Sequence, residues 1–377
     1  MRGTLARLVA VLLFAAACGP GGGAAPSEPR GSAPAAGGSQ SGSGPASAPS
    51  AAATPTAASA AGGDASSAIQ VAPTRVRVAH TVVSGSVAPF WLAKDKGFWQ
   101  QHGLDVDLTL ISGTPTAMAA LMAGEIDFST GAAEAVLSVQ AQNPEVVAIA
   151  NSSAAPTHRM VVTPDIQRIE DLRGKRMGVF QVGDGNYVLL SKVLAKYGMN
   201  AERDVTWVGV GGGNFSGLVS ALSAGAIDGT LFPPPNDLPA IKAGGQVLFN
   251  LADMDLPYAG LPSYTMRRTI EQRRPVVAAF LAGIVDGIRL FKSDPEQAKE
   301  ALRTRGGMTD PEVVDWTYEV YRGKPMAERP FVSVAGMQAV LDALLESEPV
   351  LRQVQLNRAI DNSVLEDLDR KGYLPPP

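Results

Sequence analysis

"ALMAGEIDFS" (residues 120–129) recurs later in the chain as "ALSAGAIDGT" (residues 221–230). The two stretches share the pattern Ala-Leu-x-Ala-Gly-x-Ile-Asp. Alanine and leucine favour a helix, and a glycine directly after them supplies the left-handed backbone conformation that ends many helices. We therefore predict that each copy ends a helix at Gly124 or Gly225 and begins a short strand at Ile126 or Ile227.

The segments upstream of the two copies follow one plan. In the first half, a strand is predicted in "RVRVAHTVVSG" (75–85), a helix in "APFWLAKDKGFW" (88–99) and a strand in "VDLTLIS" (106–112). The second half repeats this order with "RMGVFQVGDG" (176–185), "NYVLLSKVLAKYG" (186–198) and "VTWVGVG" (205–211). Chance similarity between two alanine-rich helices is the alternative. Agreement in element type and order over about 60 residues per half favours two α/β lobes built from βαβ units.

Composition fits an exported soluble domain. The 377 residues are 45% hydrophobic and 18% charged, with a net charge of −4, so there is no basic footprint for nucleic acid. The longest apolar run, residues 275–291, is interrupted by Asp286 and Arg289, and we do not expect it to span a membrane. Roughly 300 residues remain for the folded part, a size that favours two lobes over one core.

Cys18, the only cysteine, lies at the end of an N-terminal targeting segment. Basic residues and the apolar run Leu8 to Ala17 predict a signal peptide over residues 1–17. Ala15-Ala16-Ala17-Cys18 resembles a bacterial lipobox, in which the cysteine is lipidated; an ordinary signal peptide with an incidental cysteine is the alternative. Residues 18–71 are almost all Gly, Ala, Ser, Pro and Thr, which predicts a disordered tether. We expect lipidation of Cys18 to hold the folded part at a membrane surface.

Several segments together resemble ABC-transporter substrate-binding proteins of the nitrate/sulfonate/taurine type, which have the periplasmic-binding-protein type II fold. They are residues 89–108, 120–130, 168–179, 191–210 and 273–302. The resemblance implies two lobes, each a mainly parallel sheet flanked by helices, with a hinge between them. Lobe one would hold residues 74–161 and the returning chain 253–377, and lobe two residues 162–252. Ser333 is expected to cap the helix that follows it.

A ligand is expected at the carboxyl ends of the strands, where turns lead into helices and free N–H groups point outward. The predicted ligand-binding residues are Ser84, Ser86, Phe90, Thr114, Thr130, His158, Asp184, Asn186, Tyr187 and Asn214. Helix capping alone is the alternative for Ser84, Thr114, Asp184 and Asn214, as for Asn236 and Ser129. An Asp184 facing the cleft would repel a bare oxyanion and favour an amino group or a protonated nitrogen. The predicted ligand is therefore a small polar organic molecule.

No cofactor, metal or catalytic group is expected. His80, His102 and His158 lack metal-ligand spacing, and we expect His102 at a surface helix end. The stretches "GGGNFSG" and "VGDGN" miss the dinucleotide-binding pattern, and no nucleophile–base pairing is visible.

The resemblance implies a monomeric, lipid-anchored receptor in the periplasm or on the outer face of the cell membrane, with an ABC permease as partner. The alternative is an enzyme on the same fold. Thiamine-pyrimidine synthase relatives need a cysteine-rich loop, which a chain with Cys18 alone cannot supply. Menaquinone-pathway enzymes are cytoplasmic and would carry no lipobox.

Overall fold

The computed structural model describes residues 69–377 apart from 183, 212–214 and 346–347. The signal peptide, Cys18 and nearly all of the predicted tether lie outside the described residues, as does Asn214.

The first sheet has five strands in the order β2-β1-β3-β10-β4. Its strands are β1 (Thr74–His80), β2 (Leu104–Leu110), β3 (Phe128–Thr130), β4 (Val146–Asn151) and β10 (Pro262–Met266). β1 runs parallel to β2 and β3, whereas β10 runs antiparallel to both of its neighbours. Four strands therefore share one direction, and the returning chain supplies the fifth.

The second sheet repeats this topology strand for strand, in the order β7-β6-β8-β5-β9. Its strands are β5 (Arg159–Val162), β6 (Arg176–Val179), β7 (Thr206–Gly209), β8 (Gly229–Phe232) and β9 (Gln246–Asn250). β6 is parallel to β7 and β8, and β5 is antiparallel to β8 and β9. The two-lobed, mainly parallel architecture predicted from the repeat is thus confirmed. β5 begins at Arg159, three residues before the boundary expected at 162.

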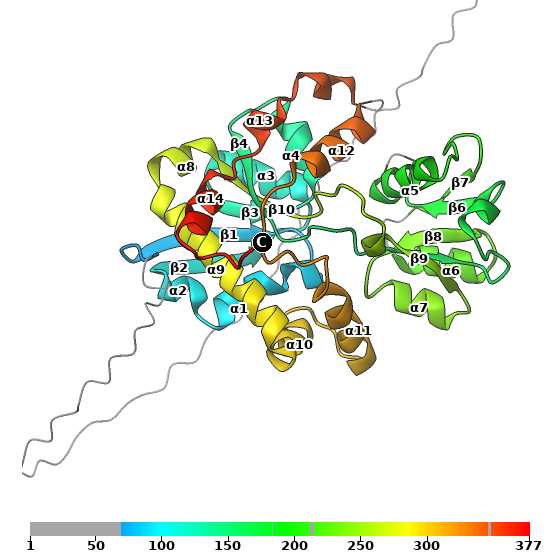
Figure 1. Ribbon diagram of the computed structural model, residues 1–377, viewed down its shortest axis with the longest axis horizontal. Coiled ribbons are helices and arrows are strands. Elements are labelled where there is room, and N and C mark those ends of the chain that lie inside the picture. The colour runs from blue at the N-terminus through cyan, green and yellow to red at the C-terminus, as the bar shows by residue number, and fades with distance from the viewer. Residues whose placement is uncertain (1–68, 183, 212–214, 346–347) are drawn as a thin grey trace, which may run out of the picture. The chain divides into compact units, whose positions relative to one another are not determined.

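Helices cover both faces of each sheet (Figure 1). The first half contributes η2 (Gly85–Val87), α1 (Ala88–Asp95), α2 (Phe98–Gln101), α3 (Thr114–Ala123) and α4 (Ala133–Gln140). Lobe two has η3 (Ile169–Leu172), α5 (Gly185–Lys196), α6 (Phe215–Ser223), α7 (Asp237–Lys242) and η4 (Leu251–Asp253). The returning chain adds α8 (Arg267–Gln272), α9 (Arg274–Ser293), α10 (Pro295–Thr304), α11 (Pro311–Tyr321), α12 (Val334–Leu344), η5 (Pro349–Gln353), α13 (Leu356–Ala359) and α14 (Ser363–Arg370).

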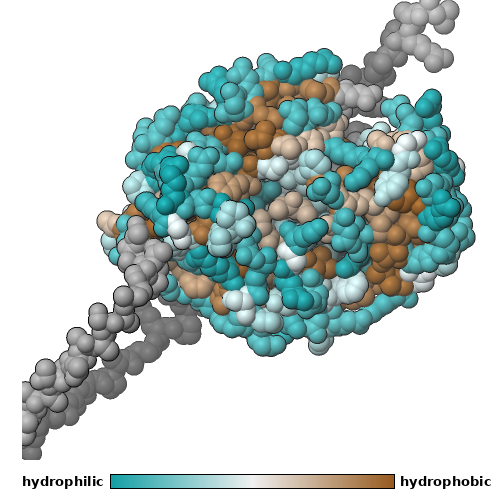
Figure 2. All heavy atoms as spheres, in the orientation of Figure 1, coloured by the Kyte–Doolittle hydropathy of each residue, from teal (hydrophilic) through white to brown (hydrophobic). Residues whose placement is uncertain are grey.

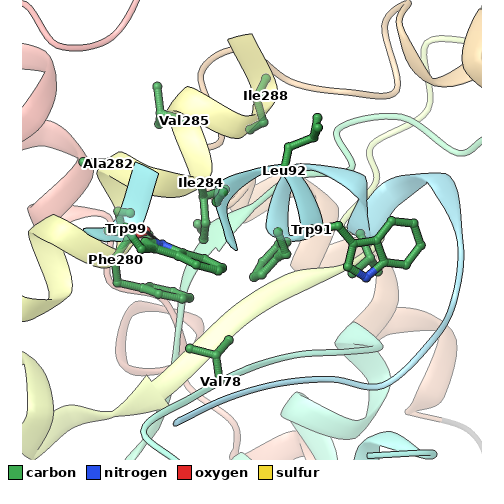
Figure 3. Packing of buried hydrophobic residues seen from close by; sticks show 14 of the residues in the cluster. Val78, Trp91, Leu92, Trp99, Phe280, Ala282, Ile284, Val285 and Ile288 are labelled. Atoms are coloured by element: carbon green, nitrogen blue, oxygen red, sulfur yellow. Dashed lines mark hydrogen bonds between the residues drawn. The ribbon is translucent and has the colours of Figure 1, made fainter. Parts of the chain in front are cut away.

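The long helix α9 fills one side of the lobe-one core. Its Phe280 stacks on Trp99 with ring centroids 5.8 Å apart, and the Trp99 indole N–H donates to the Phe280 carbonyl over 2.9 Å (Figure 3). Gly283 lies directly against Trp99, since a Cβ atom there would come within 2.2 Å of the indole ring. A small residue at this position lets α9 and α2 approach closely and exclude water from the core.

The repeated sequence pattern has a structural basis. Gly124 and Gly225 have φ values of 74° and 66°, so both helices end in the predicted left-handed conformation. The strands begin at Phe128 and Gly229, two residues later than predicted. The predicted cap is also present, because the Ser333 hydroxyl accepts from the Gly336 N–H over 3.0 Å.

No helix within the described ranges is long and apolar enough to cross a membrane. Polar side chains cover most of the face shown in Figure 2, with smaller apolar areas between them.

Candidate functional site

The turn after β1, which we call the first turn (residues 84–87), gathers hydroxyl groups at the carboxyl end of the strand. The hydroxyls of Ser84 and Ser86 lie 2.6 Å apart. Tyr321, at the end of α11, packs its ring on Gly85. Burial raises the pKa of Tyr321, so the group stays a neutral phenol.

A second cluster of hydroxyls lies where β3 and β10 meet the start of α3. Helix α3 begins at Thr114 and the cap position belongs to Gly113, so the capping role considered for Thr114 is wrong. The Thr114 hydroxyl instead accepts from the Ala132 N–H over 3.1 Å and lies 3.3 Å from the Thr81 hydroxyl. Burial raises the pKa of the neighbouring Tyr264 to about 12.

Thr130 belongs to the same end of β3 but faces the returning chain. Its hydroxyl donates to the carbonyls of Leu261 and Pro262, over 3.3 and 3.0 Å. It therefore fastens the second crossing between the lobes, residues 254–261, to the first sheet.

In lobe two, Asp184 is occupied by backbone donors. Its carboxylate accepts from the N–H groups of Tyr187 and Phe180 over 2.8 Å each, and from Gln181 over 3.2 Å. It is the N-cap of α5, as the capping alternative held. Its charge is thus balanced locally by the backbone, which removes the reason for excluding an anionic ligand.

The other lobe-two residues have structural partners as well. The Asn186 side-chain amide donates to the Leu231 carbonyl over 2.9 Å. Tyr187 packs against Trp207 with centroids 4.6 Å apart. Its ring also lines a groove of about 490 Å³ between α5 and α12, together with Lys192 and Asp342. Tyr187 and the first turn thus belong to different parts of the surface between the lobes.

His158 ends the first crossing, residues 152–158. Burial lowers the pKa of His158 to about 4, so the imidazole is neutral at pH 7. Its Nδ1 is buried and has no hydrogen-bond partner within the described part of the chain. An unpaired buried nitrogen of this kind is able to bind a ligand group.

Two residues lie elsewhere than the sequence suggested. Phe90 is fully buried in the lobe-one core, edge-on to both Trp99 and Phe280, and we leave it out of the site. His102 is only 1% exposed, so its predicted surface position is wrong. Its Nε2 lies 2.8 Å from Asp286 Oδ2 and its Nδ1 2.9 Å from the Ile69 carbonyl. This network joins Ile69 to α9 through His102.

Sequence reasoning missed three residues near the site. Tyr321 belongs to a helix more than two hundred residues from the first turn, and no local sequence pattern indicates that its ring packs there. Tyr258 lies in the second crossing, and burial raises its pKa. Glu134, near the start of α4, is half-buried; burial raises its pKa, although the Lys192 ammonium opposes the rise. The sequence signal that could have identified Glu134 is an acidic residue near the N-terminus of a predicted helix.

No group of three potential metal ligands (His, Cys, Asp or Glu) occurs among the residues placed by the structure.

A family model described as NMT1/THI5 like matches residues 84–298, more than half of the chain. A Brucella abortus protein whose name describes it as a binding protein is 27% identical over 224 residues, covering 57% of this chain and 68% of that protein.

Among solved structures, the periplasmic aliphatic sulphonate binding protein SsuA from Escherichia coli aligns with a TM-score of 0.65 and 19% identity, over 77% of this chain and 92% of its own. A cysteine-to-serine mutant of DszB in complex with biphenyl-2-sulfinic acid aligns with a TM-score of 0.58 and 14% identity, over 79% and 99%. These likenesses show that the chain has the periplasmic-binding-protein fold.

Proposed function

Because the chain belongs to the NMT1/THI5-like family, we propose that it is a solute-binding receptor that delivers a small polar organic molecule to an ABC import permease. The observation that carries this proposal is the matched pair of sheets, joined by two crossings, with helix starts at the carboxyl ends of the strands in both lobes. Two lobes on a hinge can close on one solute and bind it from both sides.

The binding groups are mostly neutral hydrogen-bonding groups. Ser84, Ser86, Thr114 and His158 supply hydroxyls and a neutral imidazole, and helix starts supply N–H groups. Thr130, Asp184, Asn186 and Tyr187 support or border the site, and Asn214 remains a predicted contact. Neutral donors and acceptors suit a polar organic solute, and a sulfonate such as those bound by SsuA would use the same N–H and hydroxyl donors.

The first test identifies the solute. The full-length protein would be extracted from membranes in a mild detergent and denatured, and the released small molecules analysed by mass spectrometry. A solute released in a one-to-one ratio is expected, and it would then be titrated by calorimetry. Ser86→Ala should weaken its binding about five- to a hundredfold, through loss of a buried hydrogen bond.

The enzyme alternative makes a different prediction. The fold alone does not decide between a receptor and an enzyme. If the identified solute is converted to another molecule at a steady rate when incubated with the protein, the receptor proposal is wrong. Recovery of unchanged solute supports it.

We also propose that the protein is a monomer held outside the cytoplasm by lipid on Cys18. The N-terminal targeting pattern and the Gly/Ala/Ser/Pro-rich segment support this anchor. Two or more acyl chains give durable membrane attachment, whereas one gives only marginal binding. Cys18→Ser should therefore move the protein from the membrane pellet to the soluble or unprocessed fraction. Unchanged fractionation would remove the lipid-anchor proposal.

A further inference from the structure

Helix α11 lies outside the stretch matched by the family model and is a fixed part of lobe one. Val314 and Tyr318 are buried in the lobe-one core, where the Tyr318 ring lies 5.5 Å from that of Phe291. An ion pair of 2.9 Å joins Asp315 to Lys299 of α10. The side chains that α11 presents to lobe two are therefore held in place by lobe one.

Lobe two contacts Trp316 of α11 from two sides. The indole N–H donates to Asp237 Oδ2, at the start of α7, over 2.9 Å. The Arg159 guanidinium lies over the indole ring, 3.9 Å from its centroid. The two lobe-two groups also pair with each other, since Arg159 Nη1 lies 2.7 Å from the same Asp237 oxygen. Both contacts of Trp316 therefore require lobe two to lie beside α11.

The Arg159–Asp237 pair is shielded from water. Asp237 is fully buried, and the Arg159 side chain is 15% exposed. Such a pair is stable only when further hydrogen bonds satisfy its polar atoms. Asp237 Oδ2 accepts from Arg159 and Trp316, whereas Oδ1 has no hydrogen-bond partner within the described residues. The Trp316 N–H is thus one of two side-chain donors to this carboxylate, and a charged acceptor strengthens the bond.

The contact lies at the hinge. Arg159 directly follows the first crossing, and its Nε donates to Asn250 Oδ1 over 2.7 Å. Asn250 ends β9, just before η4 and the second crossing. An ion pair of 2.6 Å between Glu312 and Lys242 joins the preceding turn of α11 to the end of α7. A rotation of lobe two away from α11 would separate Trp316 from Asp237 and would break this ion pair.

We propose that Trp316 is a positioning residue that holds lobe two against lobe one, through its N–H bond to Asp237 and its ring contact with Arg159. It lies outside the turns proposed to bind the solute. It stabilises the arrangement in which both lobes can contact one solute, so a solute that needs this arrangement binds more tightly. The inference rests on the proposed function for the meaning of this arrangement, but its test needs no solute.

Zero-length cross-linking of the full-length protein in a mild detergent measures how often the lobes meet. A water-soluble carbodiimide joins a lysine amine to a carboxylate that touches it, with loss of one water molecule, and mass spectrometry identifies the linked peptides. The lobe–lobe cross-link joins Lys242 to Glu312, whose side chains are 50% and 60% exposed and so contribute little stability themselves. The internal cross-link joins Lys299 to Asp315 and reports that α11 stays in place.

Trp316→Phe keeps an aromatic ring beneath Arg159 and removes the N–H donor. It should lower the initial rate of the lobe–lobe cross-link about fivefold, the effect of one lost buried hydrogen bond on the equilibrium between the two lobe arrangements. The internal cross-link should keep its wild-type rate. Trp316→Ala also removes the ring contact with the guanidinium, and it should lower the rate of the lobe–lobe cross-link further.

Trp207→Phe is the matched control, because it removes an indole N–H that donates to the Ala201 carbonyl within lobe two, over 2.7 Å. It should leave both cross-links at their wild-type rates. The inference is overturned if Trp316→Phe and Trp207→Phe give the same rate of the lobe–lobe cross-link, or if wild type forms only the internal one. A fall in both cross-links would show that α11 itself has moved, which also contradicts the proposed role.

These outcomes leave the solute-identification test of the proposed function untouched. A protein that releases no solute, yet needs Trp316 for the lobe–lobe cross-link, would instead contradict the function and keep the inference.

Discussion

Gly85 and Gly185 occupy corresponding places in the two lobes, because each is the first residue of the helical segment that follows the first strand of its half, η2 after β1 and α5 after β6. Their surroundings differ. A Cβ atom at Gly85 would meet three atoms of the Tyr321 ring at 2.4 to 2.9 Å, whereas one at Gly185 would meet nothing within 4 Å. The requirement for glycine at the first turn therefore comes from α11 and has no counterpart in lobe two.

Gly85→Ala should lower the free energy of unfolding by about 1–3 kcal/mol, because the buried ring cannot give way without moving α11. Gly185→Ala should change it by less than about 1 kcal/mol, and in the stabilising direction, since alanine favours a helix start. Urea denaturation of the two variants beside wild type measures both. Equal stability of the two variants would mean that Tyr321 is held less firmly than the structure indicates.

Asp184 caps α5 through the Tyr187 N–H and also accepts from two N–H groups of the turn before the helix. Asp184→Ala leaves three backbone N–H groups without their acceptor and should lower stability by about 1–2 kcal/mol. Asn236→Ala is the control, because Asn236 stands at the cap position of α7 without a side-chain cap bond. The expected change there is under about 0.5 kcal/mol. Melting temperatures of both variants measure these changes. A clear decrease for Asp184→Ala alone would show that the Asp184 carboxylate stabilises the fold as a helix cap.

At the scale of elements, the repeated Ile-Asp pair fastens one strand to the next in each lobe. The Asp127 carboxylate accepts from the Arg77 N–H over 2.8 Å, and the Asp228 carboxylate from the Arg176 N–H over 2.7 Å. In return, each aspartate N–H donates to the carbonyl of the same arginine over 2.8 Å. The aspartate thus sets the register between the first and third strands of its half before the third strand begins.

Asp228→Asn should lower the free energy of unfolding by about 1–3 kcal/mol at pH 7, because the carboxylate also accepts two bonds from the Arg176 guanidinium. The guanidinium is the main cause that holds the pKa of Asp228 below its usual range. A lowered folded-state pKa means that the contribution is complete above the unfolded pKa, about 4, and is lost as the pH falls through the folded value. The difference from wild type should therefore shrink below pH 4.

Asp107→Asn provides the control for this pH dependence. Asp107 pairs with Arg75 at 3.6 Å, with both side chains more than half exposed. Solvent screens such a pair, and a change under about 0.5 kcal/mol is expected at every pH. A difference for Asp228→Asn that stays constant from pH 7 to pH 3 would show that packing, and not the charge, is responsible.

The helices and strands were predictable because they depend on neighbouring residues. The site was only partly predictable because it also depends on contacts between distant segments. The glycine that ends each helix and the apolar strands are properties of neighbouring residues, so the repeat predicted both sheets. The position of His102 depends on Asp286 and Tyr373, which come from distant segments, and sequence spacing could not bring them together. Tyr321 escaped for the same reason. Phe90 lies near the N-terminus of its helix, as predicted. The direction of its ring depends on packing against Phe280 of α9, which is distant in sequence, and the ring points into the core.

At the scale of the whole molecule, the buried apolar core is divided between the two lobes. Two apolar clusters contain only lobe-two residues between Met160 and Leu256, and the other two contain none of them. Lobe two is thus an insertion with its own core, joined to lobe one by two crossings and by side-chain contacts at α11 and α12, where the Lys192 ammonium donates to the Ala339 carbonyl. The Trp316 indole N–H donates to Asp237 over 2.9 Å, and Lys242 pairs with Glu312 at 2.6 Å. Because few contacts join the lobes, lobe two should unfold locally while lobe one stays folded.

Leu194→Ala tests this independence, because Leu194 is fully buried in lobe two. The cavity should lower the opening free energy of α5 and β6 amides by about 2–5 kcal/mol, measured by native-state hydrogen exchange. Amides of α9 in lobe one should keep wild-type protection, since their cluster shares no residue with the damaged one. Ile284→Ala, which removes a buried side chain of α9 itself, is the matched control and should deprotect lobe one by a similar amount. An equal loss of protection in α9 for both variants would mean that the lobes unfold as one cooperative unit. The two crossings and the contacts at α11 and α12 would then transmit stability between the lobes.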